Sequence, residues 1–131
     1  MRMTLKKIEV ADLIGKPFEI GARGPDKYDC YGLLTEVFKR AGLQVPDYES
    51  PSDGKIIAAM MSKEVELWEK THLEPGAALL FKIPGSTHVG VYLGNDKFIH
   101  SWQGCGVLIE RLTNWQQRLV GVYRYVGHRS G

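Results

Sequence analysis

From residue 77 onward the sequence is a succession of short runs rich in β-branched and aromatic residues, separated by glycine, proline or other turn-forming residues. Runs of this length and composition are typical of β-strands, and short connections between them favour antiparallel pairing. The expected strands cover residues 77–82, 88–93, 97–101, 106–111 and 119–126. This half of the chain therefore predicts a single antiparallel sheet, against which the rest must pack.

The helical pattern lies before these strands. Asp29 is a good N-cap residue, and Gly42 is suited to the C-terminal cap of the same helix. The apolar residues between them recur at helical spacing: Leu33, Leu34, Val37, Phe38 and Ala41. A second helix is expected to start at Ser52 or Asp53 and to end either near residue 62 or at residue 68. Helices followed by consecutive strands predict an α+β domain with a sheet of about five strands.

The length and net charge of the chain exclude several classes of function. With 131 residues and 44% hydrophobic composition, residues 1–131 are expected to form one domain. A net charge of +2, from 17 basic and 15 acidic side chains, argues against nucleic acid as a partner. No run is long enough to span a membrane, and the N-terminus lacks the apolar run of a secretory signal. We therefore expect a chain that is cytoplasmic as synthesised and acts elsewhere only after release.

Cys30 falls in the first turn of the expected helix. A thiol there meets the positive end of the helix dipole and unpaired backbone N–H groups, which favour the reactive thiolate. This position predicts a lowered pKa for Cys30 and faster alkylation than at Cys105. Because the chain lacks an export signal, both cysteines are expected to be free thiols. Taken without its neighbours, Cys30 is more typical of a small buried hydrophobe.

Residues 88–100 are expected to form a hairpin with a histidine near each end. A three-residue loop at 94–96 would pair Leu93 with Lys97 and place Gly90 opposite His100. In that register His88 and His100 project from one face of the sheet. The opposite face carries the apolar residues Val89, Val91, Leu93 and Ile99. A two-residue loop would instead send His100 to the other face.

A cysteine on a helix and two histidines on one sheet face supply a nucleophile, a base and a group that orients the base. Cys30, His88 and His100 are the candidates for these three roles. The cysteines and histidines lack the close spacing of zinc ligands, so neither a metal nor another cofactor is expected. The pattern favours hydrolysis of a peptide or isopeptide bond through a thioester intermediate.

Five segments carry a resemblance to a known family: Tyr28–Leu33, Gly42–Pro46, Leu73–Gly76, His88–Gly94 and Phe98–Ser101. In order and spacing they resemble the NlpC family, papain-like cysteine peptidases that typically cleave cell-wall peptides next to D-glutamate. The resemblance runs from about Gly15 to Val126. It implies a minimal papain-like fold, hydrolysis of peptide bonds in peptidoglycan peptides, and the same three catalytic residues.

The resemblance also implies substrate contacts. Asp29 corresponds to a residue that contacts the free amine of the substrate, although its helix-capping role is an equal alternative. Phe18 stands where many members have a tyrosine that helps the oxyanion site. Many members have a serine at the position of Tyr31. An aromatic residue at this position is more similar to members in phage tail modules, and this resemblance suggests phage tail proteins as partners. Among the tryptophans, Trp102 lies on the face of His100 and is expected to stack on a ligand.

Two other functions stay open at this point. A thiol acyltransferase would use the same three residues. A weakly active or inactive module that binds cell wall or builds a phage tail would keep the fold without hydrolysis, and Phe18 favours it slightly.

Overall fold

The computed structural model describes residues 9–47 and 67–127. The second helix expected from residue 52 or 53 lies outside the described residues, but the alternative in which it continues to Trp68 is wrong because Trp68 begins a strand.

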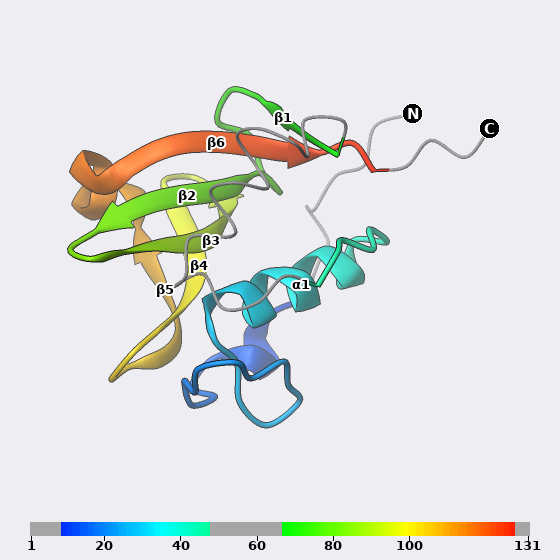
Figure 1. Ribbon diagram of the computed structural model, residues 1–131, viewed down its shortest axis with the longest axis vertical. Coiled ribbons are helices and arrows are strands. Elements are labelled where there is room, and N and C mark those ends of the chain that lie inside the picture. Colours follow the sequence, from blue (N-terminus) through cyan, green and yellow to red (C-terminus); the bar gives the residue numbers. More distant parts are fainter. Residues whose placement is uncertain (1–8, 48–66, 128–131) are drawn as a thin grey trace.

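Within these described residues, a six-stranded antiparallel sheet and one α-helix form the frame of the structure (Figure 1). The spatial order of the strands is β1-β6-β2-β3-β4-β5. Their bounds are Trp68–Lys70 for β1, Ala78–Ile83 for β2, Ser86–Gly94 for β3, Lys97–Trp102 for β4, Gly106–Arg111 for β5 and Leu119–Tyr125 for β6. Helix α1, Cys30–Arg40, packs on one face against β3 and β4. The 3-10 helices η1, Ala11–Leu13, and η3, Leu112–Arg118, lie before α1 and between β5 and β6.

The α+β class and all five expected strands are confirmed, but the sheet has one strand more than expected. Strand β1 pairs with β6 through Trp68 opposite Tyr125. Trp68 is fully buried, and its ring packs against the rings of Phe38 and Tyr125. A three-residue strand at the end of an apparent helical pattern carries almost no periodicity of its own, which explains why the sequence did not reveal it.

Helix α1 begins and ends as expected. The Asp29 carboxylate accepts a hydrogen bond from the Gly32 N–H at 2.7 Å, which is the geometry of an N-cap. At the other end Gly42 adopts a φ of 86°, a left-handed conformation in which glycine avoids the strain of a side chain. These two residues fix the length of α1 and thereby place Cys30 at its N-terminus.

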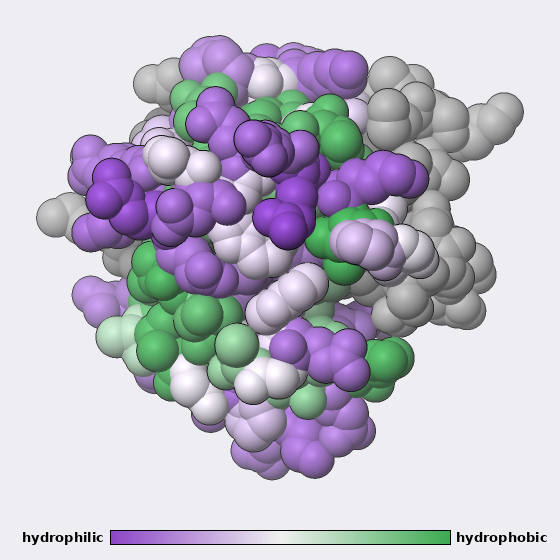
Figure 2. All heavy atoms as spheres, turned by 90° about the vertical axis from the view of Figure 1, so that its left-hand side faces the viewer, coloured by the Kyte–Doolittle hydropathy of each residue, from purple (hydrophilic) through white to green (hydrophobic). Residues whose placement is uncertain are grey.

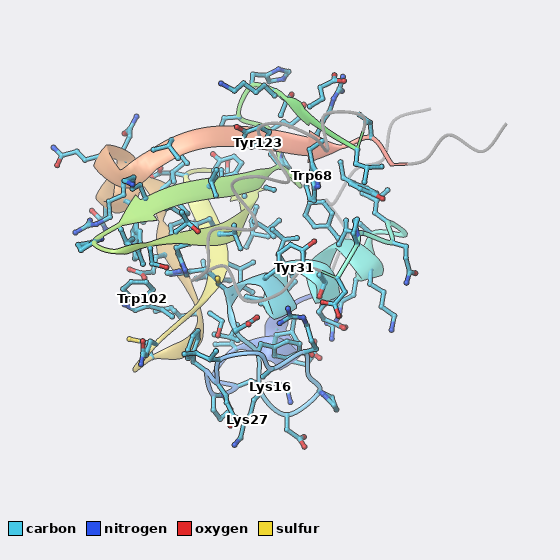
Figure 3. The ribbon with its side chains drawn as sticks, in the orientation of Figure 1. Lys16, Lys27, Tyr31, Trp68, Trp102 and Tyr123 are labelled. Carbon is cyan, nitrogen blue, oxygen red and sulfur yellow. The ribbon has the colours of Figure 1, made fainter. Side chains whose placement is uncertain are left out.

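Two apolar clusters lie on the two faces of the sheet. The larger one fills the layer between α1 and the sheet, and Tyr31 and Trp68 both lie in it (Figure 3). The second cluster covers the opposite face and consists of Leu79, Phe81, Tyr92, Phe98, Leu112 and Trp115. Trp102 packs on this second cluster, away from α1 (Figure 3). Both sheet faces are therefore covered, one by a helix and one mainly by aromatic side chains.

The β3–β4 turn differs from the expected loop but keeps the expected register. Asn95 and Asp96 have φ values of 53° and 66°, and Gly94 pairs with Lys97 across this two-residue turn. An irregularity between Tyr92 and Gly94 compensates for the missing loop residue, so that Val91 lies opposite Ile99. The expected pairing of Leu93 with Lys97 is wrong, yet the histidines still share a face because the irregularity restores the register.

The described surface is mainly hydrophilic on the side seen in Figure 2, with separate apolar areas. Exposed large apolar residues are few in the described ranges: Ile14, Ile20, Leu73, Ile109 and Val120. No helix within these ranges is long and apolar enough to cross a membrane.

Candidate active site

Cys30 is the first residue of α1 and lies against strand β3. Its side chain is only 4% exposed. The sulfur accepts hydrogen bonds from backbone N–H groups, including that of Val89, the residue after His88. Within the described residues no hydrogen bond joins this sulfur to the His88 ring, and a looser approach is common in enzymes without substrate. The sulfur of the candidate nucleophile thus binds the backbone of β3 at the residue that follows the candidate base.

Burial raises the pKa of the Cys30 thiol to about 12. Loss of hydration outweighs the backbone N–H groups that favour the thiolate, and the charge of Asp29 raises the pKa further. The expectation of a lowered pKa is therefore wrong in direction. In the substrate-free protein the thiol keeps its proton, so attack on a carbonyl requires a base that removes this proton as the new bond forms.

We expect alkylation of Cys30 by iodoacetamide to accelerate steadily between pH 7 and pH 10. The thiolate fraction of a group with a pKa of about 12 grows roughly tenfold per pH unit in this range. Peptide mapping by mass spectrometry would follow Cys30 alongside the exposed Cys105 in the same sample. A rate that is constant from pH 5 to pH 8 would show a preformed thiolate–imidazolium pair and contradict the prediction.

His88 and His100 are in direct contact on the sheet face opposite α1. His88 Nε2 lies 2.7 Å from His100 Nδ1, and both side chains are buried. Gly90 makes this approach possible, because a Cβ there would lie 3.3 Å from the His100 Cβ and 2.9 Å from the Phe98 ring. The expectation that the two imidazoles share one face of the sheet is confirmed, and they are in contact.

Four aromatic side chains surround the two imidazoles: Phe81, Phe98, Trp102 and Trp115. The Trp115 ring stacks on the His88 ring, with centroids 5.6 Å apart. Burial holds the pKa of His88 well below its ordinary value, and the neighbouring His100 lowers it further. The pKa of His100 is also lowered by burial, although Glu110 partly offsets this. Both imidazoles are thus neutral at neutral pH, as a base requires.

Two residues at this site were not found from the sequence. Trp115 belongs to η3, a short helix that the sequence pattern does not predict. Glu110 lies on β5, and its Oε2 is 2.8 Å from His100 Nε2. The register of β4 with β5 would have revealed Glu110. Glu110 lies directly opposite Phe98 on β4, and His100, two residues further along β4, is therefore its diagonal neighbour on the same face.

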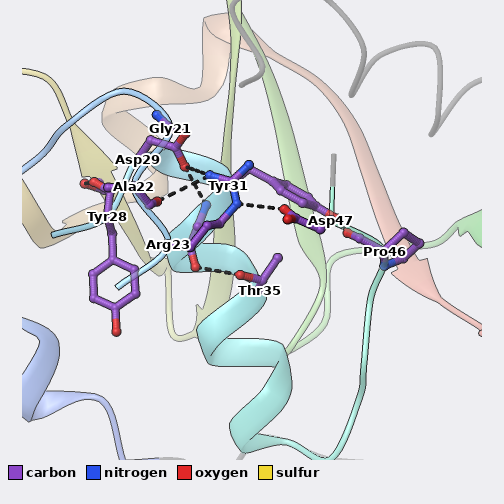
Figure 4. Close-up of polar contacts among 11 residues, drawn as sticks. Gly21, Ala22, Arg23, Tyr28, Asp29, Tyr31, Thr35, Pro46 and Asp47 are labelled. Carbon is purple, nitrogen blue, oxygen red and sulfur yellow. Dashed lines mark hydrogen bonds and ion pairs between the residues drawn. The ribbon is translucent and has the colours of Figure 1, made fainter. Parts of the chain in front are cut away.

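Asp29 has several partners besides its cap (Figure 4). Its side chain, 1% exposed, accepts hydrogen bonds from the Gly21 N–H at 2.9 Å and from Arg23 Nη1 at 2.8 Å. Arg23 also binds the exposed Asp47 at 2.8 Å. The helix-capping alternative for Asp29 is thus confirmed, and a substrate amine would have to share its carboxylate with Arg23.

The other residues expected to contact substrate differ in exposure. Tyr31 is fully buried, with its hydroxyl donating to the Pro46 carbonyl and Arg23 over its ring (Figure 4). Phe18 is half-buried and lies beside Tyr28, two residues before Cys30. Trp102 is half-buried with its ring centroid 4.9 Å from that of His88. The described contacts place Trp102 next to the imidazole pair and tie Tyr31 to the protein interior.

Both cysteines are free thiols, as expected. In the part of the chain that the structure describes, no group of three histidine, cysteine, aspartate or glutamate side chains is arranged to hold a metal ion.

Residues 15–124 match the NlpC/P60 family. The chain belongs to this family. The matched residues contain α1 with Cys30 and the strands that carry His88, His100 and Glu110. The resemblance drawn from the sequence motifs is therefore confirmed at the level of the family.

Three curated relatives are between 30% and 32% identical to this chain over the aligned residues. The "Probable endopeptidase p60" of Listeria grayi is 32% identical over 85% of this chain and 20% of its own length. The Escherichia coli protein "Murein DD-endopeptidase MepS/Murein LD-carboxypeptidase" is 30% identical over 84% of this chain and 56% of its own. The "Gamma-DL-glutamyl hydrolase" of Bacillus subtilis is 31% identical over 92% and 28%. The chain thus spans between a fifth and somewhat more than half of these relatives.

Solved NlpC/P60 structures share the fold. The NlpC1 structure from Trichomonas vaginalis has a TM-score of 0.64 at 23% identity and covers 95% of this chain and 48% of its own. A lipoprotein-like NLP/P60 protein from Staphylococcus aureus has a TM-score of 0.62 at 24% identity, over 89% and 39%. The papain-like fold expected from the resemblance is confirmed.

Proposed function

We propose that this chain is a cysteine peptidase that hydrolyses peptide bonds in bacterial cell-wall peptides, next to D-glutamate, through a thioester intermediate. The observation that carries the proposal is the contact of 2.7 Å between His88 and His100, next to Val89, whose backbone N–H binds the Cys30 sulfur. Relatives named as murein endopeptidase and as glutamyl hydrolase support the substrate class.

In the proposed reaction Cys30 is the nucleophile, and His88 transfers protons in each step. His88 takes the proton of the Cys30 thiol while the sulfur attacks the carbonyl carbon of the scissile bond. Backbone N–H groups at the start of α1 stabilise the oxyanion, without the hydroxyl that a tyrosine in place of Phe18 would add. The amine leaves with the proton from His88, and water, activated by the same imidazole, then releases the acid product and regenerates the thiol.

Incubation of the purified chain with defined wall peptides, followed by mass spectrometry, tests the proposal. Product masses next to D-glutamate, absent from a Cys30→Ala digest, are the expected result. Joining of the acyl part to an added amine would instead favour the acyltransferase. Absence of any product would favour the inactive wall-binding or phage-tail module.

We expect the preferred substrate to have a free N-terminal amine, bound by Asp29. A charge-assisted hydrogen bond is worth about 1.5–3 kcal/mol, so a free-amine tetrapeptide should turn over roughly 10- to 100-fold faster than its N-acetylated form. Asp29→Asn keeps the size and some capping ability but should reduce this preference. Asp47→Asn, which removes the exposed partner of Arg23, is the matched control. Equal turnover of both peptides by the wild type would leave Asp29 as a helix cap alone.

A role in a phage tail and cytoplasmic synthesis before release also belong to this proposal. The phage-tail relationship depends on Tyr31 in place of the common serine. Tyr31 is buried, so its effect on a substrate pocket would be indirect, through the segment around Pro46 that it binds. Detection of the protein in purified virions, or only in the cytoplasmic fraction of cells, would decide between these locations.

A further inference from the structure

A chain of three side chains runs across neighbouring strands at the site. His88 on β3 contacts His100 on β4 at 2.7 Å, and His100 contacts Glu110 on β5 at 2.8 Å. Each contact uses a different ring nitrogen: Nε2 of His88 meets Nδ1 of His100, and Nε2 of His100 meets Oε2 of Glu110. Glu110 ends the chain near the surface, with 29% of its side chain exposed, whereas His100 has no exposed area.

The chemistry of the three groups fixes the direction of both hydrogen bonds. A carboxylate only accepts, so His100 must donate through Nε2. A neutral imidazole has a single N–H, which leaves Nδ1 of His100 as an acceptor for the N–H on Nε2 of His88. His88 then has no proton on Nδ1. That nitrogen keeps a free lone pair, which is what a base needs.

We infer that Glu110 is a positioning residue of this site: its carboxylate sets the tautomers of His100 and His88, so that His88 presents an unprotonated Nδ1 to the nucleophile. The inference rests on the proposed function only for its consequence in catalysis, since the tautomers follow from the contacts themselves. None of the five segments that resemble the family contains Glu110, which lies ten positions after His100 on the edge strand β5.

The negative charge of Glu110 also favours a proton on the pair. When His88 accepts the thiol proton, the carboxylate at the far end of the chain is the nearest described group of opposite charge that contacts the imidazoles. The other ionisable groups on the packed elements include Cys30 on α1 and Arg118 on η3, which lies over the outer Trp115 ring. Lys82 on β2, Lys97 on β4 and Arg111 on β5 are exposed, and Glu36 and Arg40 on α1 pair with each other. Exposure of Glu110 to water weakens its effect but does not remove it, because the His100 end of the hydrogen bond is dry.

Three variants separate the charge from the hydrogen bond. Glu110→Gln keeps an oxygen that accepts from His100 but removes the charge, and Glu110→Ala removes both. We expect kcat to fall roughly tenfold for glutamine and roughly 100-fold for alanine, with KM nearly unchanged because Glu110 is not proposed to touch the substrate. Glu69→Gln is the control, since it deletes a carboxylate from the exposed ion pair with Arg124 at the other edge of the sheet.

Two readouts distinguish positioning from simple loss of structure. The acid limb of kcat/KM should move to lower pH in both Glu110 variants, because Glu110 raises the pKa of His100. Nitrogen-15 spectra of the imidazoles should show protonated Nε2 on both histidines in the wild type and mixed tautomers in Glu110→Ala. These spectra need no substrate, so they test the inference even if wall peptides are not cleaved.

Other results would overturn the inference. Protonated Nδ1 on His88 in the wild type would do so, as would wild-type tautomers in Glu110→Ala. An acid limb that stays in place while the melting temperature falls would mean that Glu110 serves only stability.

Discussion

Replacement of Cys30 by alanine is expected to lower hydrolysis of a susceptible wall peptide by roughly 10³- to 10⁶-fold, the range found when a nucleophile is removed from a catalytic triad. In the proposed reaction the sulfur forms the thioester, and the other cysteine, Cys105, is exposed in the β4–β5 turn. Residual turnover would come from substrate binding and oxyanion stabilisation alone. Initial rates measured by chromatography of the products give the comparison.

Stability and a second cysteine provide the controls for this variant. Cys30 is buried and small, so its alanine variant should lose only about 1 kcal/mol of unfolding free energy. Cys105→Ser changes an exposed thiol in the β4–β5 turn and should retain full activity. If the Cys30→Ala protein is folded and still cleaves the peptide at a tenth of the wild-type rate or more, Cys30 is not the nucleophile.

The positions of the candidate catalytic residues could be predicted because local rules determine them. Asp29 and Gly42 mark the ends of α1 by capping, and alternation along β3 separates the face of His88 from that of Val89. The hairpin shows the limit of such rules. The sequence indicated a three-residue loop, whereas the chain has a two-residue turn preceded by an irregularity between Tyr92 and Gly94. Both arrangements place Val91 opposite Ile99.

What the sequence did not reveal depends on contacts between distant segments. Trp115 reaches His88 only because η3 folds back over β2 and β5, and Glu110 reaches His100 only across the β4–β5 register. The pKa of Cys30 has the same origin. A position at a helix N-terminus favours the thiolate, but packing against β3 buries the sulfur, and burial is the larger effect. Strength of burial cannot be read from a helical pattern.

Burial explains why the thiol and both imidazoles of the candidate site are uncharged at neutral pH. A protonated thiol, two neutral imidazoles and a carboxylate at the outer end keep charge out of the buried region until a substrate carbonyl is attacked. Aromatic rings on the outer side of the histidines keep this region dry. In the proposed reaction, the Cys30 proton would move to His88 as the sulfur attacks the carbonyl carbon, which would give a tetrahedral intermediate and an imidazolium. The Glu110 carboxylate would balance the imidazolium charge through His100.

Replacement of His88 by glutamine should lower kcat roughly 10²- to 10⁴-fold, the usual contribution of a general base. The glutamine amide can still donate to His100 Nδ1, so the variant keeps a hydrogen bond to the orienting group while losing the group that accepts the thiol proton. His72→Gln is the matched control. His72 is 82% exposed and contacts only Glu74 among the described ion pairs, so its variant should keep wild-type activity.

The pH dependence of the unfolding free energy of the same variant distinguishes a buried neutral histidine from an exposed one. Because the pKa of His88 is held well below 6.5 in the folded chain, the unfolded chain binds one more proton as the pH falls through 6.5. The wild type should therefore lose up to about 1.4 kcal/mol of unfolding free energy per pH unit from this group below pH 6.5, and His88→Gln should lose correspondingly less. Urea titrations at pH 7, 6 and 5 measure the difference. An equal slope in both proteins, together with activity above a tenth of the wild type, would mean that His88 is neither the buried neutral group nor the base.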